Sequence, residues 1–229
     1  MATNKKLPAH LTQYQHAIVA IDTVVFSMIK GELMVLLLKI TRDVFKGKWA
    51  IPGGLILPQE NLEQAVERHL LYKTGFKKPY IEQLYTFADV NRDPRGRVVS
   101  VAHLVLTADQ DHKLVTGSEY GDIKWFKVNE LPPLAYDHKD VIMTGLERLR
   151  AKLGYTNIAQ HLLPPTFALS DLQSVYESVL SRKLDKRNFR KKILSLDIVE
   201  KTDKKIVGSF RPAELYRFKS KKSRIVEIL

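Results

Sequence analysis

The sequence reads GGLILPQENLEQAVERHLLYKTGF from Gly53 to Phe76, and this stretch decides the fold. A glycine pair is followed by Glu60 and then by a segment with helical spacing over residues 61–72. Glycines let a backbone approach a phosphate group closely, and a following helix offers its N-terminal amide groups and its dipole to an anion. The stretch therefore predicts a loop and a helix that hold a phosphorylated ligand.

The composition describes a globular chain with an excess of positive charge. The 229 residues are enough for one large or two ordinary domains, and 45% of them are hydrophobic. Lysine and arginine number 37 against 25 acidic residues, a formal net charge of +12, which favours a polyanionic partner such as nucleic acid. The absence of cysteine excludes disulfides and thiolate sites. No stretch has the pattern of a signal peptide or a membrane span, so we expect a cytoplasmic protein without membrane contact.

The positive charge is concentrated in the last third of the sequence. Residues 155–229 carry 16 lysines and arginines against 8 acidic residues, whereas residues 1–154 carry 21 against 17. Two prolines stand close to this change, in the segment 162–165. The pattern predicts an N-terminal domain of residues 1–154 and a smaller basic domain of residues 155–229.

The N-terminal domain is predicted to be mixed α/β. Two apolar runs at residues 17–29 and 33–40 surround the turn signal Lys30-Gly31-Glu32 and indicate a hairpin. Further strands are expected at residues 81–88, 97–107 and 122–126, and helices at 61–72 and 138–152. Asp137 is well suited to cap the second helix.

The opening stretch resembles the Nudix box, whose pattern is Gly, five residues, Glu, seven residues and then Arg-Glu-apolar-x-Glu-Glu-x-Gly-apolar. The matching positions are Gly54, Glu60, Arg68, Gly75 and Phe76. In active members of that family the glutamates after the arginine gather on one helix face around a divalent metal ion, usually Mg²⁺.

The three positions of those glutamates hold His69, Tyr72 and Lys73 in this chain. None of these side chains is an anionic oxygen ligand, and a lysine ammonium group repels a metal ion. Glu63 and Glu67 do not replace them, because on a helix they point roughly 120 to 160 degrees away from His69. We therefore expect no required metal and no or very weak hydrolysis, and we interpret the three substituted side chains as mainly structural.

A second stretch, residues 86–97, favours a binding pocket beside the glycine pair. It joins two predicted strands and carries three arginines, whose guanidinium groups are suited to hold phosphates, although an ordinary charged hairpin loop is the alternative. The candidate ligand-binding residues are Arg42, Trp49, Gly53, Gly54, Glu60, Arg68, Phe87, Asp93, Arg95, Arg97, Asp137 and His138. A purely structural role remains open for the last two, and no catalytic or metal-binding residue is predicted.

The C-terminal domain has the pattern of a winged helix-turn-helix. Ser170-Asp171-Leu172-Gln173 is interpreted as a capping box before an amphipathic helix. After a short turn at residues 181–184, Asp185 is expected to cap a second helix over residues 186–196. The segments 197–201 and 214–218 alternate like paired strands around a basic loop that contains glycine, which would form the wing.

The second helix exposes residue types that contact phosphates and base edges. The candidate DNA-binding residues are Lys186, Arg187, Asn188, Arg190 and Lys191 of this helix, and Lys204, Lys205 and Arg211 of the wing. A merely solvated basic face is the alternative.

Taken together, these features resemble the Nudix-related transcriptional regulators of bacterial NAD metabolism. The resemblance rests on the degenerate Nudix domain, Leu-Leu-Pro-Pro at 162–165, LDKRNFRKK at 184–192 and RPAELYRF at 211–218, and it covers nearly the whole chain. It implies an α/β Nudix fold with a mixed sheet between helices, followed by a smaller α+β winged helix-turn-helix domain. It also implies a homodimeric repressor of NAD biosynthesis or salvage genes, which binds double-stranded operator DNA and is released by ADP-ribose or a related NAD-derived nucleotide.

Two other functions remain open from the sequence. One is an active Nudix ADP-ribose pyrophosphohydrolase with an accessory nucleic-acid-binding domain, which would use Glu60 and another acid to hold the metal. The other is a nucleic-acid-binding module whose Nudix domain serves only as a dimerisation scaffold. The lost carboxylates count against the first, and the glycine pair with the arginine-rich loop counts against the second.

Overall fold

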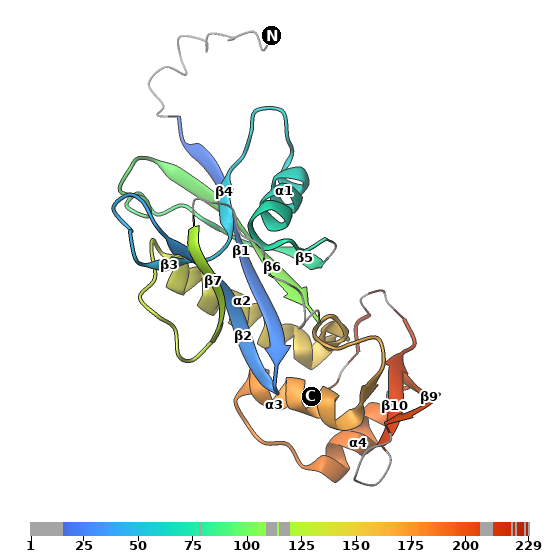
Figure 1. Ribbon diagram of the computed structural model, residues 1–229. Coiled ribbons are helices and arrows are strands. Elements are labelled where there is room, and N and C mark those ends of the chain that lie inside the picture. Colours follow the sequence, from blue (N-terminus) through green and yellow to red (C-terminus); the bar gives the residue numbers. More distant parts are fainter. Residues whose placement is uncertain are drawn as a thin grey trace.

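The computed structural model describes residues 16–77, 79–108, 114, 120–206, 213–220, 222, 224–226 and 228. These residues form a seven-stranded mixed sheet covered by helices, followed by a three-stranded sheet with two further helices (Figure 1). The predicted fold class, a mixed α/β domain followed by a smaller α+β domain, is confirmed.

The large sheet is built around one long strand, β1 (Ile18–Ile29). β1 pairs antiparallel with β2 (Glu32–Ile40) and parallel with β6 (Val98–Thr107), which makes the sheet mixed. The remaining strands are β3 (Trp49–Ala50) and β7 (Tyr120–Lys127) on β2, β4 (Gly53–Leu55) on β1, and β5 (Tyr80–Phe87) on β6. The predicted hairpin and the three further predicted strands are confirmed. Among the strands of this sheet, only the short β3 and β4 were not foreseen, and β4 contains the glycine pair itself.

Two hydrophobic layers cover the two faces of β1. Ile21 and Val25 pack with Ala65 and Val66 of α1 (Leu62–Thr74) on one face. Val24 and Phe26 belong to the larger cluster on the other face, which includes α2 (His138–Tyr155). Burial on both faces explains why the β1 sequence is a nearly continuous apolar run instead of an alternating one.

The first helix is fixed at both ends by its own sequence. The Asn61 side chain accepts a hydrogen bond from Gln64 N at 2.8 Å, and the Gln64 side chain accepts one from Asn61 N at 2.9 Å. Gly75 ends the helix in the left-handed conformation with φ of 80°. The predicted helix is therefore confirmed, and its caps determine which of its side chains face the glycine pair.

The second helix begins at His138 as predicted, but the prediction that Asp137 caps it is wrong. Asp137 occupies the N-cap position without a capping hydrogen bond from its side chain. Its two carboxylate oxygens instead accept hydrogen bonds from Arg92 at 2.9 and 2.8 Å. A charged partner from a distant loop competes successfully for the carboxylate, because a charge-assisted bidentate bond is stronger than a bond to a backbone amide.

The C-terminal part forms the predicted winged helix-turn-helix. α3 (Leu169–Leu180) and α4 (Lys186–Ser195) are joined by a short turn, and Asp185 caps α4 by accepting from Asn188 N at 2.8 Å, as expected. β9 (Val199–Ile206) and β10 (Ala213–Phe218) pair antiparallel, and β8 (Phe167–Ala168) pairs with β10.

Two local predictions in this domain are wrong. α3 starts at Leu169 with Ala168 at the N-cap, so Ser170 lies inside the helix, and Asp171 accepts from Ala168 N at 2.9 Å. β9 extends to Ile206, so Lys204 and Lys205 belong to a strand and not to the wing loop. Arg211 lies outside the described residues.

The two sheets are joined by a shared core. Leu149 of α2, Leu162 of the 3-10 helix η2 (Ile158–Leu162) and Val175 of α3 belong to the same cluster of buried side chains as Phe26. Several hydrogen bonds cross the junction: among them, Leu33 N donates to Ser178 Oγ and Arg150 Nε donates to Val179 O, each at 2.8 Å. α3 is thus attached directly to the β1–β2 hairpin and to α2. None of the helices in the described ranges combines the length and apolarity needed to cross a membrane.

Candidate functional site

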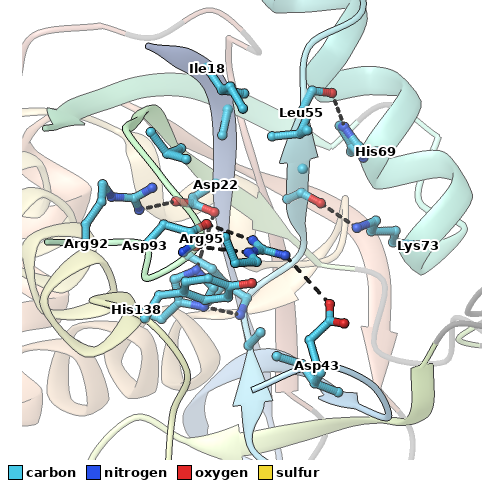
Figure 2. Close-up of a pocket in the computed structure, with 18 of the residues that line it drawn as sticks. Ile18, Asp22, Asp43, Leu55, His69, Lys73, Arg92, Asp93, Arg95 and His138 are labelled. Carbon is cyan, nitrogen blue, oxygen red and sulfur yellow. Dashed lines mark hydrogen bonds and ion pairs between the residues drawn. The ribbon is translucent and has the colours of Figure 1, made fainter. Parts of the chain in front are cut away.

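A cavity of about 880 Å³ lies beside the first half of β1, and its size suits a nucleotide-sized ligand. Its walls come from β1, the glycine pair, one face of α1 and the loop that follows β5 (Figure 2). The structure brings seven of the predicted ligand-binding residues into this lining: Arg42, Gly53, Gly54, Arg68, Asp93, Arg95 and His138.

The other five predicted residues are not part of the cavity lining: Trp49, Glu60, Phe87, Arg97 and Asp137. Trp49 packs edge-on against Phe126, with ring centroids 4.6 Å apart. Arg97 donates to the backbone carbonyl of Ala88 at 2.8 Å. A role for these five residues in ligand binding remains a prediction.

Glu60 and Arg68 clamp the glycine loop to α1. Arg68 Nε donates to Glu60 Oε2 at 2.8 Å, and a second guanidinium nitrogen donates to Leu55 O at 3.0 Å. Glu60 also accepts from Leu57 N at 2.6 Å. The hydrogen bond from Arg68 lowers the pKa of Glu60 to about 2, so its carboxylate stays ionised at neutral pH.

The glycine pair is required by contacts within the protein itself. A Cβ atom on Gly53 would lie within 3 Å of the carbonyl oxygen of Ile21 and the side chain of Asp22. Gly54 has φ of 156°, and a Cβ there would lie within 3 Å of the His69 ring. The predicted reason for these glycines was close approach of a phosphate, whereas the structure shows that β1 and His69 occupy the space.

The floor of the cavity is a buried network of charges. Asp22 Oδ2 accepts hydrogen bonds from Arg92 at 2.9 Å and from Ser100 Oγ at 2.7 Å, and His138 Nε2 lies 3.5 Å from Asp22 Oδ1. Burial raises the pKa of Asp22, but His138, Ser100 and Arg92 together more than offset this and hold the pKa well below its usual range. Asp22 is therefore a carboxylate, and the network fixes the positions of the groups around it.

Sequence reasoning missed the central members of this network, Asp22, Arg92 and Ser100. One signal was available: Asp22 is a single acid inside the apolar run of β1, and a buried acid is nearly always paired. Nothing in the sequence shows that Arg92 turns inward while Arg95, three residues later, remains half-exposed. The inward direction depends on Asp22 and Asp137, which are distant in sequence.

Arg95 is the guanidinium group best placed to meet a ligand. Asp93 orients it by accepting from Arg95 Nε at 2.9 Å and from a terminal nitrogen at 2.7 Å. Its guanidinium carbon lies 5.4 Å from the centre of the Tyr136 ring, which also lines the cavity. The hydrogen bond from Arg95 lowers the pKa of Asp93. The pair thus presents a fixed cation at the cavity wall.

The helix face that holds metal ligands in the Nudix pattern does not fit a metal ion here. His69 Nε2 lies 3.0 Å from Leu55 O, and Lys73 Nζ donates to Gly53 O at 2.5 Å (Figure 2). Tyr72 is exposed. Within the described ranges, no group of three or more histidine, aspartate or glutamate side chains is arranged to hold a metal ion. A neutral imidazole, a phenol and an ammonium group do not supply the anionic oxygens that Mg²⁺ requires.

The predicted DNA-binding helix presents an exposed basic face. Phe189 and Ile193 are its buried residues, whereas Lys186, Arg187, Asn188, Arg190 and Lys191 are all exposed. Arg190 also lies 3.3 Å from the Tyr216 hydroxyl and 3.9 Å from Glu214, which ties α4 to β10. The side chains of Lys204 and Lys205 lie outside what the structure describes.

Comparison with known proteins decides the family. A family model for the NUDIX domain matches residues 18–144, and one for the NrtR DNA-binding winged helix domain matches residues 159–218. The chain is 36% identical over 220 residues to the ADPR responsive transcriptional repressor NtrR of Acinetobacter baylyi, an alignment that covers 92% of this chain and 87% of the relative. The chain belongs to the NrtR family.

Solved NrtR structures agree with this assignment. The crystal structure of Shewanella oneidensis NrtR complexed with a 27mer DNA superposes with a TM-score of 0.77 at 34% identity, over 88% of this chain and 93% of that one. The NUDIX domain of the same protein complexed with ADP ribose superposes with a TM-score of 0.54 at 32% identity, over 63% of this chain and 94% of that one. The resemblance to Nudix-related transcriptional regulators, drawn from the sequence, is confirmed.

Proposed function

We propose that this NrtR-family protein is an ADP-ribose-responsive transcriptional repressor of NAD biosynthesis or salvage genes. It binds operator DNA as a homodimer, and ADP-ribose releases it. The observation that carries the proposal is that one chain contains two sites: a cavity lined by arginine side chains and an exposed basic helix. A relative of 36% identity bears the name of an ADPR responsive transcriptional repressor.

The DNA-binding site consists of α4 and the β9–β10 wing. The exposed Lys186, Arg187, Asn188, Arg190 and Lys191 of α4 contact phosphates and base edges of the operator, and Lys204, Lys205 and Arg211 add contacts from the wing. Because these contacts release counterions from DNA, the affinity falls steeply as the salt concentration rises. The domain that carries this site comprises residues 155–229.

The effector site is the cavity of the N-terminal domain, residues 1–154. Arg42, Arg68 and Arg95 line it and favour the diphosphate of ADP-ribose, while the glycine pair and His138 shape its walls. Trp49, Glu60, Phe87, Arg97 and Asp137 do not line the cavity, and their predicted role in binding the effector belongs to the same proposal. Because operator DNA is in the cytoplasm, the protein acts there.

β1 and its hairpin provide a direct route between the two sites. Ile18, Ala20 and Asp22 of β1 line the cavity, and the hairpin at the other end of this strand bonds to α3 through Leu33 and Ser178. ADP-ribose binds the DNA-free arrangement more tightly, so DNA must weaken ADP-ribose binding by the same factor. We expect a coupling free energy of about 1–3 kcal/mol, expressed as a rotation of the winged helices relative to the Nudix core.

Hydrolysis is absent or very weak in this protein, because the helix face lacks the acids that would hold a metal. Because such a receptor does not cleave its effector, the fraction of occupied sites follows the concentration of ADP-ribose. The alternative is an active Nudix ADP-ribose pyrophosphohydrolase with an accessory nucleic-acid-binding domain, which the match of residues 18–144 to the NUDIX domain favours.

The experiment measures fluorescence anisotropy of the full chain on the DNA upstream of its own operon. ADP-ribose is added at fixed salt, and the mixture is then assayed for AMP. Release of DNA with intact ADP-ribose supports the repressor. Unchanged anisotropy contradicts effector control, and formation of AMP favours the hydrolase.

A further inference from the structure

We propose that the Lys73 ammonium group replaces the divalent metal ion in this cavity, so that the diphosphate of the ligand binds without metal. The inference rests on the proposed function for the identity of the ligand, and it specifies how the negative charge of that ligand is neutralised. Lys73 was not among the ligand-binding residues predicted from the sequence.

The position of Lys73 is fixed by α1 and by two walls of the cavity. The caps at Asn61 and Gly75 set the register of the helix, and this register places Lys73 in the last turn, facing β4. The residue is 7% exposed and lines the cavity. Lys73 Nζ donates to Gly53 O at 2.5 Å (Figure 2). It also donates to the Tyr120 hydroxyl at 2.5 Å, so the ammonium group is held between β4 and β7.

The ammonium group occupies the helix position from which a Nudix glutamate would hold the metal. A fixed positive charge at this position opposes the approach of a divalent cation. His69, one turn earlier, adds no negative charge: burial lowers its pKa, and Lys73 and Arg68 lower it further. His69 is therefore neutral at neutral pH, and this face of α1 repels metal ions instead of collecting them.

A diphosphate lying along the glycine pair comes within reach of Lys73, because Gly53 is itself a hydrogen-bond partner of the ammonium group. A phosphate oxygen that replaces the neutral Tyr120 hydroxyl supplies an anionic acceptor, and charge-assisted hydrogen bonds are roughly twice as strong as neutral ones. Arg95, oriented by Asp93, supplies a second cation from the opposite loop. Together, Lys73 and Arg95 bring two charge-assisted hydrogen-bond donors to the diphosphate, the role that a divalent ion would otherwise have.

Isothermal titration calorimetry of the full chain tests this inference with two probes, ADP-ribose and inorganic diphosphate. Each is titrated in EDTA and in excess Mg²⁺. We expect the wild-type affinity in EDTA to equal or exceed that in Mg²⁺. Lys73→Met should weaken binding in EDTA about 10- to 100-fold, as expected for loss of a charged hydrogen bond. Lys73→Glu should also bind poorly in EDTA and regain affinity when Mg²⁺ is added.

Lys77→Met is the matched control, because Lys77 is an exposed lysine just beyond the same helix and is not part of the cavity lining. Its affinity should equal that of the wild type. A wild-type protein that binds ADP-ribose only with Mg²⁺, or a folded Lys73→Met variant with unchanged affinity, overturns the role of Lys73 and leaves the repressor proposal intact.

The opposite failure has a different signature. Metal-free binding of inorganic diphosphate that depends on Lys73, without binding of ADP-ribose, supports the ammonium site and overturns the proposed effector. Absence of binding by both probes under both conditions overturns both proposals. If Lys73→Met does not fold, the comparison of wild-type affinity in EDTA and in Mg²⁺ decides the question.

Discussion

The cavity floor and α4 both contain arginine, but its charge is buried and paired in the first and exposed to solvent in the second. Arg92 is 7% exposed and is bonded to two carboxylates, whereas Arg187 projects from α4 into solvent. The buried charge of Arg92 is already bonded to these two carboxylates, so it contributes rigidity and is not available to a ligand. An exposed charge keeps its water and remains available to a phosphate. The two carboxylate partners of the buried side chain, not the residue type, therefore separate the structural arginine from the binding one.

The largest expected effect comes from Arg92→Met, which removes the partner of Asp22 and Asp137. Two carboxylates then remain in a buried environment, so the free energy of unfolding should fall by about 3–5 kcal/mol. Urea unfolding followed by circular dichroism measures this change. Lys124→Met is the control, because its ion pair with Asp122 is exposed and should contribute little to the free energy of unfolding. Equal losses in the two variants would contradict the comparison.

On α4, the expected effect is on binding and not on stability. Arg187→Ala should weaken operator binding by about 1–3 kcal/mol, or roughly 5- to 150-fold, while the free energy of unfolding changes by less than about 0.5 kcal/mol. Anisotropy and urea unfolding measure the two quantities. Lys139→Ala removes one exposed charge from α2 and should leave operator affinity unchanged. The affinity for ADP-ribose should also be unchanged in Arg187→Ala, and a parallel loss would argue against separate sites.

His161 of η2 is a partly buried side chain whose effect on stability should depend on pH, and this extends the comparison of buried and exposed charges. Burial lowers the pKa of His161 to about 4, from 6.5, and its ring is stacked on Tyr80 at 4.2 Å. Between these pH values the unfolded chain binds the extra proton, so the stability present above pH 6.5 is lost as the pH falls toward 4.

His161→Phe keeps a stacked ring and removes the titration. Allowing for the partial exposure of His161, the loss of stability from pH 7 to pH 4 should be about 1–2 kcal/mol smaller in the variant than in the wild type. Urea unfolding at a series of pH values measures this difference. The contribution of Asp22 is separate, because its lowered pKa makes that contribution fade only below the ordinary range of aspartate. Identical pH profiles for both proteins would show that folding does not lower the pKa of His161.

The smallest expected effect is that of Ser178→Ala, which removes the acceptor of Leu33 N at the junction. The free energy of unfolding should fall by about 1 kcal/mol. If the hairpin transmits the signal, ADP-ribose should also release less DNA from this variant at saturation. Ser174→Ala is the control, since its hydroxyl bonds within α3 to Ser170 O and is exposed. An unchanged DNA response in Ser178→Ala would place the coupling route elsewhere.

Much of the fold was readable from the sequence because its signals are local. The strand predicted at residues 17–29 forms as β1 (Ile18–Ile29) because a continuous apolar run is buried on both faces. Asp185 caps α4 because its side chain reaches a nearby amide. The prediction at Ser170 failed because the helix begins earlier, and the prediction at Asp137 failed because Arg92 is a better partner for its carboxylate. Such competition depends on residues that are close only after folding.

The candidate site was predictable in outline but not in its internal order. Arg95 and the glycine pair line the cavity, since the Nudix pattern and the arginine-rich loop point to the same region. Asp22 and Lys73 were not assigned to the site, because the role of each side chain depends on the groups that it contacts after folding. The sequence shows which chemical groups are present, whereas the contacts formed on folding determine which of them remain available to a ligand.

The parallel pairing of β1 with β6 has a consequence for the order of synthesis. Ile18 pairs with Val98 and Ser27 with Thr107, so the central strand cannot complete its sheet until most of the N-terminal domain has been made. The elements from β8 to β10 come later in the chain and contact one another locally. The DNA-binding domain is therefore synthesised when the cavity-bearing sheet is already able to fold. During synthesis, the effector cavity can therefore form before the DNA-binding domain is complete.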